Sequence, residues 1–229
     1  MKLVVVIPAH NEEKNIYAVV KNIPRTIPGV RSIEVVVVDD SSHDLTYQTA
    51  RSAGAKVLSH PINLGAGGAA LTGITYGQRL NADIIVTLDG DGQHNPKEIT
   101  RLVKKYHQNR ADMIIGSRFM SKTIKKMPLV RKVGNRGFSL VTYLLSGKMV
   151  SDTQSGFRLF GPNMIKTLMS VELVGYEFCS ETIMIAHSNK LVIEEVPITT
   201  IYSKTRQGGQ SALNGLEILL RLIYRKLVG

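Results

Sequence analysis

The sequence contains a single cysteine, Cys179, and no tryptophan, and aromatic residues make up only 6% of its 229 residues. One cysteine excludes both a disulfide framework and a metal site built from several thiolates, and it favours a reducing compartment. No run reaches the roughly 20 apolar residues of a transmembrane helix, and the first residues predict a strand instead of a signal peptide. We therefore expect a cytoplasmic protein with an aliphatic core, peripheral to a membrane if it contacts one.

Acidic residues are scarce relative to basic ones. The chain has 29 Lys and Arg against 18 Asp and Glu, a net charge of +11. The basic residues concentrate in 101–136, at Lys204 and Arg206, and in 221–226. Surfaces that bind nucleic acid interleave basic and aromatic side chains, and the sequence lacks this pattern. The excess therefore favours an anionic lipid or phosphate partner at a membrane surface, with a solvated basic surface as the alternative.

Four apolar runs each end on polar or charged residues. The runs and their endings are Leu3–Ile7 before Pro8-Ala9-His10-Asn11-Glu12-Glu13, Val35–Val38 before Asp39-Asp40-Ser41-Ser42, Ile84–Leu88 before Asp89-Gly90-Asp91, and Met113–Ile115 before Gly116-Ser117-Arg118. Such runs are typical of parallel strands buried on both faces. Ligands of open α/β sheets bind beyond the carboxyl ends of the strands, so the four endings predict one shared site, of an enzyme.

Strand and helix signals alternate along the chain, which predicts a single α/β domain with a Rossmann-like, mostly parallel central sheet flanked by helices. The predicted strands cover 3–7, 33–38, 56–59, 83–88, 112–116 and 192–196. The predicted helices cover 12–22, 44–53, 63–80, 130–146, 162–169 and 177–188, and a further helix has Asn95 as its N-cap and Pro96 at its first position. The helix at 12–22 has an acidic first turn, and the one at 63–80 starts with the glycine-rich residues 63–70. A basic amphipathic helix is predicted over 212–228, suited to a membrane interface, a core contact or an oligomer contact.

The turn after the strand at 83–88 carries two carboxylates. Asp89 and Asp91 are two residues apart, so both can face the same crevice. Carboxylate oxygens are hard ligands that suit Mg²⁺ or Mn²⁺. The alternative is a solvated turn without a metal. The glycine-rich stretch 63–70 lacks the Gly-Lys-Ser/Thr of a P-loop, so we expect its glycines to permit close helix packing or approach of a nucleotide.

Six motifs follow one another along nearly the whole chain: Val6–Glu12, Val38–Ser42, Leu88–His94, Gly116–Arg118, Asp152–Arg158 and Arg206–Ser211. The first four resemble family 2 glycosyltransferases of the GT-A fold. The last two resemble the polyprenyl-phosphate branch of that family, typified by dolichol-phosphate mannose synthases. The membrane-spanning tail of some of those relatives has no counterpart in this sequence.

The resemblance implies roles for the residues at the matching positions. It implies a metal site for Mg²⁺ or Mn²⁺ at Asp89, Asp91 and Gln93. It implies nucleotide-sugar contacts at Pro8, Ala9, Asn11, Glu12, Asp39, Asp40, Gly65, Asp89, Gly90 and Arg206. It implies acceptor-phosphate contacts at Arg118, Arg131 and Asn135, the last in place of a serine of the relatives. The residues expected to act in catalysis are Asp91, Asp152, Arg118 and Arg131.

Some of these roles have alternatives. Glu12 could serve only as a partner of a helix dipole, and the choice between Asp39 and Asp40 as the nucleotide contact stays open. Asp152 could orient the sugar or the acceptor, or act as a general base toward a hydroxyl acceptor. Each arginine taken alone could form a surface ion pair.

The resemblance implies an inverting transfer of a hexose, first of all mannose from GDP-mannose, to polyprenyl or dolichyl phosphate. A lipid monophosphate, with a second pKa of about 6, is already anionic at neutral pH and needs orientation more than a strong base. Alternatives are a UDP-glucose or UDP-N-acetylhexosamine donor, transfer to a glycan hydroxyl, or a non-enzymatic nucleotide-sugar-binding or membrane-scaffolding protein. We expect residues 1–118 to bind the donor and the metal, residues 119–211 to bind the acceptor, and residues 212–229 to form the amphipathic helix. The protein is expected on the cytoplasmic face of a membrane, and its oligomeric state stays open.

Overall fold

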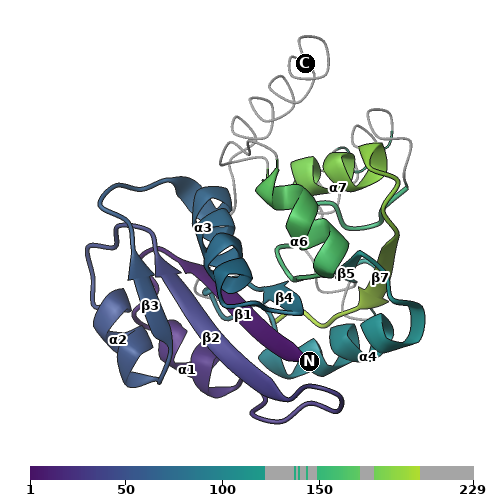
Figure 1. Cartoon of the computed structure of the whole chain (residues 1–229). Helices are drawn as coiled ribbons and strands as arrows, with labels where there is room; N and C mark the ends of the chain where they lie inside the picture. The colour runs from purple at the N-terminus through teal and green to yellow at the C-terminus, as the bar shows by residue number, and fades with distance from the viewer. Residues whose placement is uncertain (122–136, 138, 140–142, 144–148, 171–177, 202–229) are drawn as a thin grey trace.

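A seven-stranded sheet forms the centre of the computed structural model, which describes residues 1–121, 137, 139, 143, 149–170 and 178–201 (Figure 1). The strand order is β3-β2-β1-β4-β6-β5-β7. The strands are β1 (Lys2–Ala9), β2 (Ser32–Asp39), β3 (Lys56–Ser59), β4 (Ile84–Thr87), β5 (Met113–Ser117), β6 (Arg158–Phe160) and β7 (Ile193–Pro197). Neighbouring strands are parallel except at β6, which is antiparallel to both β4 and β5. The predicted mostly parallel α/β sheet is confirmed.

Helices cover both faces of this sheet (Figure 1). The helices are α1 (Ile16–Lys21), α2 (Thr46–Ser52), α3 (Gly65–Arg79), the 3-10 helix η1 (Pro96–Glu98), α4 (Ile99–Asn109), α6 (Pro162–Met169) and α7 (Phe178–Ser188). Successive side chains of a strand point to opposite faces. Leu3, Val5 and Ile7 of β1 accordingly belong to a core cluster with α1, α2 and α4, whereas Val4 and Val6 belong to a second cluster with α3, α6 and α7.

Helix α3 packs closely on the sheet through two glycines. A Cβ atom at Gly73 would lie 2.1 Å from Val6 Cγ1, and one at Gly77 would lie 2.9 Å from Ile85 Cδ1. Only glycine allows this approach without displacement of the strands. We expected such packing from the glycines of 63–70, but the two that contact the sheet lie further along the helix.

The start of the first helix differs from the prediction. Helix α1 begins at Ile16 and has no acidic residue in its first turn, so the predicted start at Glu12 is wrong. The N–H of Glu12 donates to Thr46 Oγ1 (2.7 Å), and the N–H of Glu13 donates to Asp44 Oδ2 (3.2 Å). These bonds to the loop after β2 hold the two glutamates in a turn that precedes the helix. Glu12 still lies at the N-terminal end of α1, where its backbone oxygen accepts from the N–H of Ile16 (2.9 Å), so its role as a partner of the helix dipole stays open.

Most other boundaries agree with the prediction within a few residues. The predicted cap at Asn95 is present, since its side chain accepts from the N–H of Lys97 and Pro96 opens η1. Strand β6 is the element that was missed. It has three residues, all buried, and its first residue is an arginine, so neither alternation nor an apolar run marked it in the sequence.

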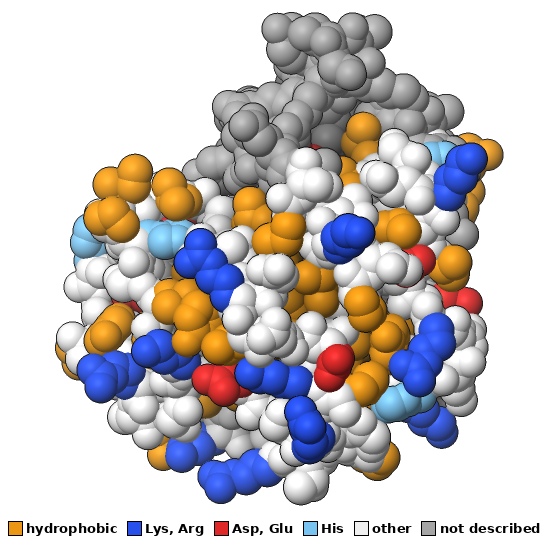
Figure 2. All heavy atoms as spheres, in the orientation of Figure 1, with side chains coloured by type: hydrophobic (Ala, Val, Ile, Leu, Met, Phe, Trp, Pro, Cys, Tyr) orange, Lys and Arg blue, Asp and Glu red, His pale blue; other side chains and the backbone are white. Residues whose placement is uncertain are grey.

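Two predicted helices lie wholly or largely outside the described residues. The helix predicted at 212–228 lies wholly outside them. Of the helix predicted at 130–146, only residues 137, 139 and 143 are described. Among the residues that the structure describes, no helix is long and apolar enough to cross a membrane. On the face drawn in Figure 2, Lys and Arg side chains are scattered among uncharged ones. That face therefore presents no continuous basic platform.

Candidate active site

The carboxyl ends of β1, β2, β4 and β5 lie along one edge of the sheet. Strands β1, β2 and β4 are mutually parallel, and β5 runs in the same direction because both β4 and β5 are antiparallel to β6. The segments that follow these ends are those predicted to carry the site, beginning at residues 10, 40, 88 and 118. The topology thus brings the four polar endings to a common edge, as predicted.

The turn after β4 holds the two carboxylates expected to bind metal. Leu88 is fully buried, the Asp89 side chain is 47% exposed, and Asp91 is half-buried. Asp91 accepts from the backbone N–H of Gln93 at Oδ1 (2.9 Å) and from Gln93 Nε2 at Oδ2 (2.6 Å). Burial, together with the nearby charge of Asp89, raises the pKa of Asp91. Ionising Asp91 in the folded protein therefore costs free energy that a bound cation would offset.

The donor chemistry of this turn fits Mg²⁺ or Mn²⁺, which bind through one or two carboxylates together with substrate phosphates. Among the residues that the structure describes, no group of three His, Cys, Asp or Glu side chains is placed to hold a metal ion. Gly156 leaves room for Asp89, because a Cβ there would lie 2.5 Å from Asp89 Oδ1. With the Gln93 amide nitrogen donating to Asp91, the atom of Gln93 suited to a cation is Oε1.

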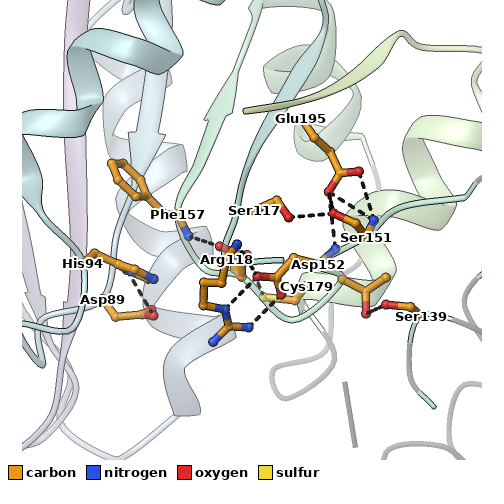
Figure 3. A network of polar contacts seen from close by, with 12 residues as sticks. Asp89, His94, Ser117, Arg118, Ser139, Ser151, Asp152, Phe157, Cys179 and Glu195 are labelled. Atoms are coloured by element: carbon orange, nitrogen blue, oxygen red, sulfur yellow. Dashed lines mark hydrogen bonds and ion pairs between the residues drawn. The ribbon is translucent and has the colours of Figure 1, made fainter. Parts of the chain in front are cut away.

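Arg118, directly after β5, is held by Asp152 (Figure 3). Asp152 Oδ2 accepts from the N–H of Arg118 (2.9 Å) and from its Nε (2.7 Å), and Oδ1 accepts from Nη2 (2.7 Å). Asp152 is fully buried, whereas the Arg118 side chain is 21% exposed. The bidentate guanidinium compensates the charge of this buried carboxylate. The geometry gives Asp152 a role that the sequence did not indicate, the orientation of Arg118, and it does not favour proton abstraction by this carboxylate.

Glu195 of β7 fixes the segment that carries Asp152. Its carboxylate accepts from the N–H (3.0 Å) and Oγ (2.7 Å) of Ser151 and from the N–H of Asp152 (3.3 Å). Ser151 Oγ also lies 2.6 Å from Ser117 Oγ, at the end of β5. These contacts tie β5, β7 and the segment before β6 into one network around Arg118 (Figure 3).

Arg158, which begins β6, is fully buried and structural. Its guanidinium donates to the backbone oxygens of Thr153, Ser155 and Cys179, each at 2.7 Å, and to Thr182 Oγ1. Burial lowers the pKa of this guanidinium. Although Arg158 belongs to one of the family motifs, its donors hold the segment 153–156 and helix α7 in place, and it is not exposed to a substrate.

The loop after β1 is bonded to the loop after β2. Asn11, at φ 56°, donates its N–H to Ser42 Oγ (2.9 Å) and accepts from the N–H of His43 at Oδ1 (2.9 Å). Glu12 is buried and its Oε2 accepts from Asn15 Nδ2 (2.8 Å). The structure therefore brings the residues predicted for the first wall of the nucleotide site next to the second strand end.

The end of β1 also contacts the Asp89–Asp91 turn. A Cβ at Gly90 would lie 3.1 Å from the backbone oxygen of Pro8 and 3.3 Å from Ala9 Cβ. Gly90 is buried, so this contact leaves little space for a side chain. Three residues predicted as nucleotide contacts thus pack against one another at the centre of the edge.

Asp39 and Asp40 differ in their environments. Both are buried, but Asp40 Oδ1 accepts from the N–H of Leu64 (2.9 Å) and lies 2.7 Å from His60 Nδ1. Asp39 accepts at Oδ1 from the N–H of Ser42 at 3.2 Å. Asp40 therefore holds the segment before α3, and that helix begins at Gly65, whose φ is 79°. This favours Asp39 as the carboxylate that contacts a nucleotide.

Three predicted site residues lie outside the described residues: Arg131, Asn135 and Arg206. The last described residue, Ile201, donates its N–H to the backbone oxygen of Gln93 (2.9 Å). The described chain therefore ends beside the turn at residues 89–93, five residues before Arg206.

Several residues that shape the site were not predicted from the sequence. His60 and Glu195 carried no local signal, since each acts on a residue 20 or more positions away. Arg158 could have been found, because an arginine between Phe157 and Leu159 in an apolar segment is typical of a buried, fully bonded guanidinium. Gly156 has its role only through contact with Asp89, a residue distant in the chain.

Comparisons with known proteins agree with this architecture. The family model described as Glycosyl transferase family 2 matches residues 4–155. The chain is 41% identical to an uncharacterized protein of Methanocaldococcus jannaschii, with 99% of this chain and 93% of that protein covered. It is 37% identical to the UDP-N-acetylglucosamine–dolichyl-phosphate N-acetylglucosaminyltransferase of Methanococcus voltae, with 97% and 95% covered. It is 30% identical to the dolichol-phosphate mannosyltransferase of Pyrococcus furiosus, with 98% and 63% covered.

Solved structures show the same fold. Glucosyl-3-phosphoglycerate synthase from Mycobacterium tuberculosis, in complex with UDP, superposes with a TM-score of 0.74 at 20% identity and covers 100% of this chain and 81% of its own. The same synthase with Mn²⁺, UDP-glucose and phosphoglyceric acid gives a TM-score of 0.72. The predicted GT-A fold is confirmed, and the chain belongs to glycosyl transferase family 2.

Proposed function

We propose that this glycosyltransferase is metal-dependent and inverting, and that it transfers a sugar from a nucleotide diphosphate-sugar to a polyprenyl phosphate. Three observations support the proposal: the carboxylate pair at the end of β4, the fixed arginine at the end of β5, and the activities for which the M. voltae and P. furiosus relatives are named. The donor would bind at the ends of β1, β2 and β4, within residues 1–118. The acceptor would bind beyond Arg118, within residues 119–211.

The hydrogen bonds between Asp152 and Arg118 are the observation that favours a phosphate acceptor over a hydroxyl acceptor. A hydroxyl acceptor needs a general base, and Asp152 was the candidate for that role. The buried carboxylate instead accepts three hydrogen bonds from Arg118, so protonating it would break a bidentate ion pair. A lipid phosphate is already anionic at neutral pH and needs no such base. The geometry therefore supports a phosphate acceptor over a glycan hydroxyl.

On the donor side, Asp89 and Asp91 would hold the cation, with Gln93 Oε1 as a further oxygen. A divalent cation there supplies Lewis-acid stabilisation of the diphosphate leaving group. Asp39 would accept from the base or ribose, while Asp40 holds the segment before α3 in place. Asn11 and Glu12 would form the wall on the β1 side, and Arg206 would add a phosphate contact.

On the acceptor side, Asp152 presents the Arg118 guanidinium in one orientation. Guanidinium groups match phosphate oxygens in a bidentate manner. Arg131 and Asn135 would complete this phosphate site. Attack of the phosphate oxygen on the anomeric carbon, opposite the departing nucleotide, inverts the configuration in a single displacement.

For the donor, we propose a UDP-activated N-acetylhexosamine. The relative whose name specifies UDP-N-acetylglucosamine is 37% identical and matches almost its entire length, whereas the mannosyltransferase is 30% identical and is covered over 63% of its length. The expectation of GDP-mannose remains a prediction and is the competing case. Peripheral attachment to the cytoplasmic face of a membrane through basic residues, where the acceptor headgroup resides, belongs to the same proposal.

The test is a transfer assay with the purified chain, Mn²⁺ or Mg²⁺, and a short polyprenyl phosphate. UDP-N-acetylglucosamine, UDP-glucose and GDP-mannose are supplied separately, and lipid-linked sugar is measured by mass spectrometry. We expect product with the UDP-N-acetylhexosamine and none with chelator. If product forms with GDP-mannose and not with the UDP-sugars, the proposed donor is wrong and GDP-mannose is the donor. Transfer to a glycan hydroxyl, with none to the lipid phosphate, would overturn the acceptor.

A further inference from the structure

His94 is a buried histidine directly behind the metal-binding turn. Its side chain is 3% exposed, and its ring lies against Phe157 with the ring centroids 5.3 Å apart. Its backbone forms an antiparallel bridge with Thr200, beyond β7. These contacts from two distant segments hold the ring in a fixed place.

One ring nitrogen of His94 faces the site. Nδ1 is buried and has no hydrogen-bond partner among the described residues. It lies 3.5 Å from Asp89 Oδ2, and Figure 3 shows the ring pointing toward that carboxylate. A carboxylate oxygen accepts and does not donate, so Nδ1 is placed to donate to Asp89 Oδ2 in the tautomer that has its hydrogen on Nδ1. A buried donor without a partner is unfavourable for folding alone, which suggests a role in the site.

Asp89 is thus confined from two sides. Oδ2 faces His94 Nδ1, and Oδ1 faces Gly156, where a Cβ atom would lie only 2.5 Å away. Gly156 is itself fixed, since its backbone oxygen accepts from Thr87 Oγ1 at 2.8 Å. The side chain of Asp89 is nevertheless 47% exposed, so it is open to a ligand on its remaining side.

We infer that His94 is a positioning residue, which directs its Nδ1–H at Asp89 Oδ2 and so sets the direction in which Asp89 presents its oxygens to the cation. The inference rests on the metal role proposed above for Asp89. Groups that hydrogen-bond or orient metal-binding carboxylates typically change metal affinity by about 10- to 100-fold when they are removed. His94 is not proposed as a ligand, because its buried Nδ1 faces the carboxylate.

The experiment compares two substitutions of similar size. In His94→Asn the side-chain amide nitrogen keeps a donor near the position of Nδ1, whereas His94→Leu fills the space without a donor. Mn²⁺ binding to the full chain is titrated by electron paramagnetic resonance of the free ion, with and without UDP, and thermal unfolding is measured without metal. Asp91→Ala is the control for loss of the site.

We expect the Mn²⁺ dissociation constant to rise about 10- to 100-fold in His94→Leu and to stay near that of the unsubstituted protein in His94→Asn. The unfolding temperature of metal-free His94→Leu should not fall, because the change removes an unpartnered buried donor. Unchanged Mn²⁺ affinity in His94→Leu, or equal losses in both variants, would overturn the inference. So would a loss of affinity that accompanies a drop in unfolding temperature.

The proposed function can fail separately. If the unsubstituted protein binds Mn²⁺, Asp91→Ala does not, and no sugar reaches polyprenyl phosphate, the acceptor is wrong while the role of His94 stands on its binding data. If the unsubstituted protein itself does not bind Mn²⁺ with or without UDP, both the metal site and the inference are refuted.

Discussion

Replacing Gly156 with alanine should disable the site without unfolding the protein. Gly156 is not among the glycines with positive φ in the described residues, so its backbone accepts an alanine. The added Cβ, however, would lie 2.5 Å from Asp89 Oδ1 and 3.1 Å from both Asp89 Cγ and Oδ2, where ordinary contacts begin at 3.4 Å. Since the Asp89 side chain is 47% exposed, it can move outward and relieve the clash.

The size of the effect follows from that movement. Asp89 Oδ1 must retreat by about 1 Å, and a misplacement of about 1 Å in a catalytic constellation can cost roughly 100-fold in rate. A 100-fold loss corresponds to about 2.7 kcal/mol of transition-state stabilisation. We expect a loss of this order in kcat/KM for sugar transfer, together with weaker Mn²⁺ binding and an unfolding temperature close to that of the unsubstituted protein.

The assay combines transfer kinetics, Mn²⁺ titration and thermal unfolding. Gly54→Ala serves as the matched control, because Gly54 has a φ of 94° and an added methyl group there would meet nothing within 4 Å. That variant should lose stability through backbone strain and keep its metal affinity. If Gly156→Ala retains both turnover and Mn²⁺ affinity, Asp89 does not bind the cation with its side chain in the position seen in the structure.

The remaining predictions address charge. Asp91→Asn should remove the pH dependence that Asp91 gives to the unfolding temperature of the metal-free protein: a raised folded pKa means that ionisation of Asp91 destabilises the fold as pH rises above the unfolded value. The unsubstituted protein should therefore lose stability relative to the variant between low pH and pH 7, and a constant difference between the two would contradict the argument. Arg158→Met should lower the free energy of unfolding in urea by about 3 kcal/mol or more, because several buried acceptors lose their donor; a change below about 1 kcal/mol would show that they find other partners. Arg131→Ala should weaken lipid-phosphate use about 10- to 100-fold while nucleotide binding, measured by calorimetry, is unchanged; equal loss of both would misplace the acceptor site. Binding to anionic vesicles should weaken as salt rises, and deletion of 213–229 should reduce it; no binding at low salt would exclude attachment through charge.

The sequence was informative where the signal was local. The strand at 84–87 and the turn Asp89–Asp91 stand out because an apolar run is followed at once by carboxylates and glycines, a pattern set by residues adjacent in the chain. Strand β3, helix α6 and the cap at Asn95 were predicted for the same reason, because the residues that determine each of them are close together in the chain. Topology then followed from the rule that parallel strands share one carboxyl edge.

Contacts between distant segments could not be predicted in this way. The choice between Asp39 and Asp40 depends on His60, 20 residues beyond Asp40, and no local pattern relates the two. Similarly, Glu195 acts on Ser151 and Asp152 only because β7 lies beside β5 in the sheet. Strand β6 was missed since three buried residues that start with an arginine resemble neither an amphipathic strand nor an apolar one.

The two acids expected to act in catalysis illustrate why environment decides a role that residue type leaves open. Asp152 is buried with its partner supplied by the protein, the bidentate guanidinium of Arg118. Asp91 is held beside a second carboxylate, and burial and that neighbouring charge raise its pKa. Arg118 compensates the charge of Asp152, whereas under the proposed function a cation from outside would compensate the charge of Asp91. If the proposed function is right, only the donor half of the site needs a metal, so chelation should abolish donor binding yet leave the Arg118–Asp152 pair in place.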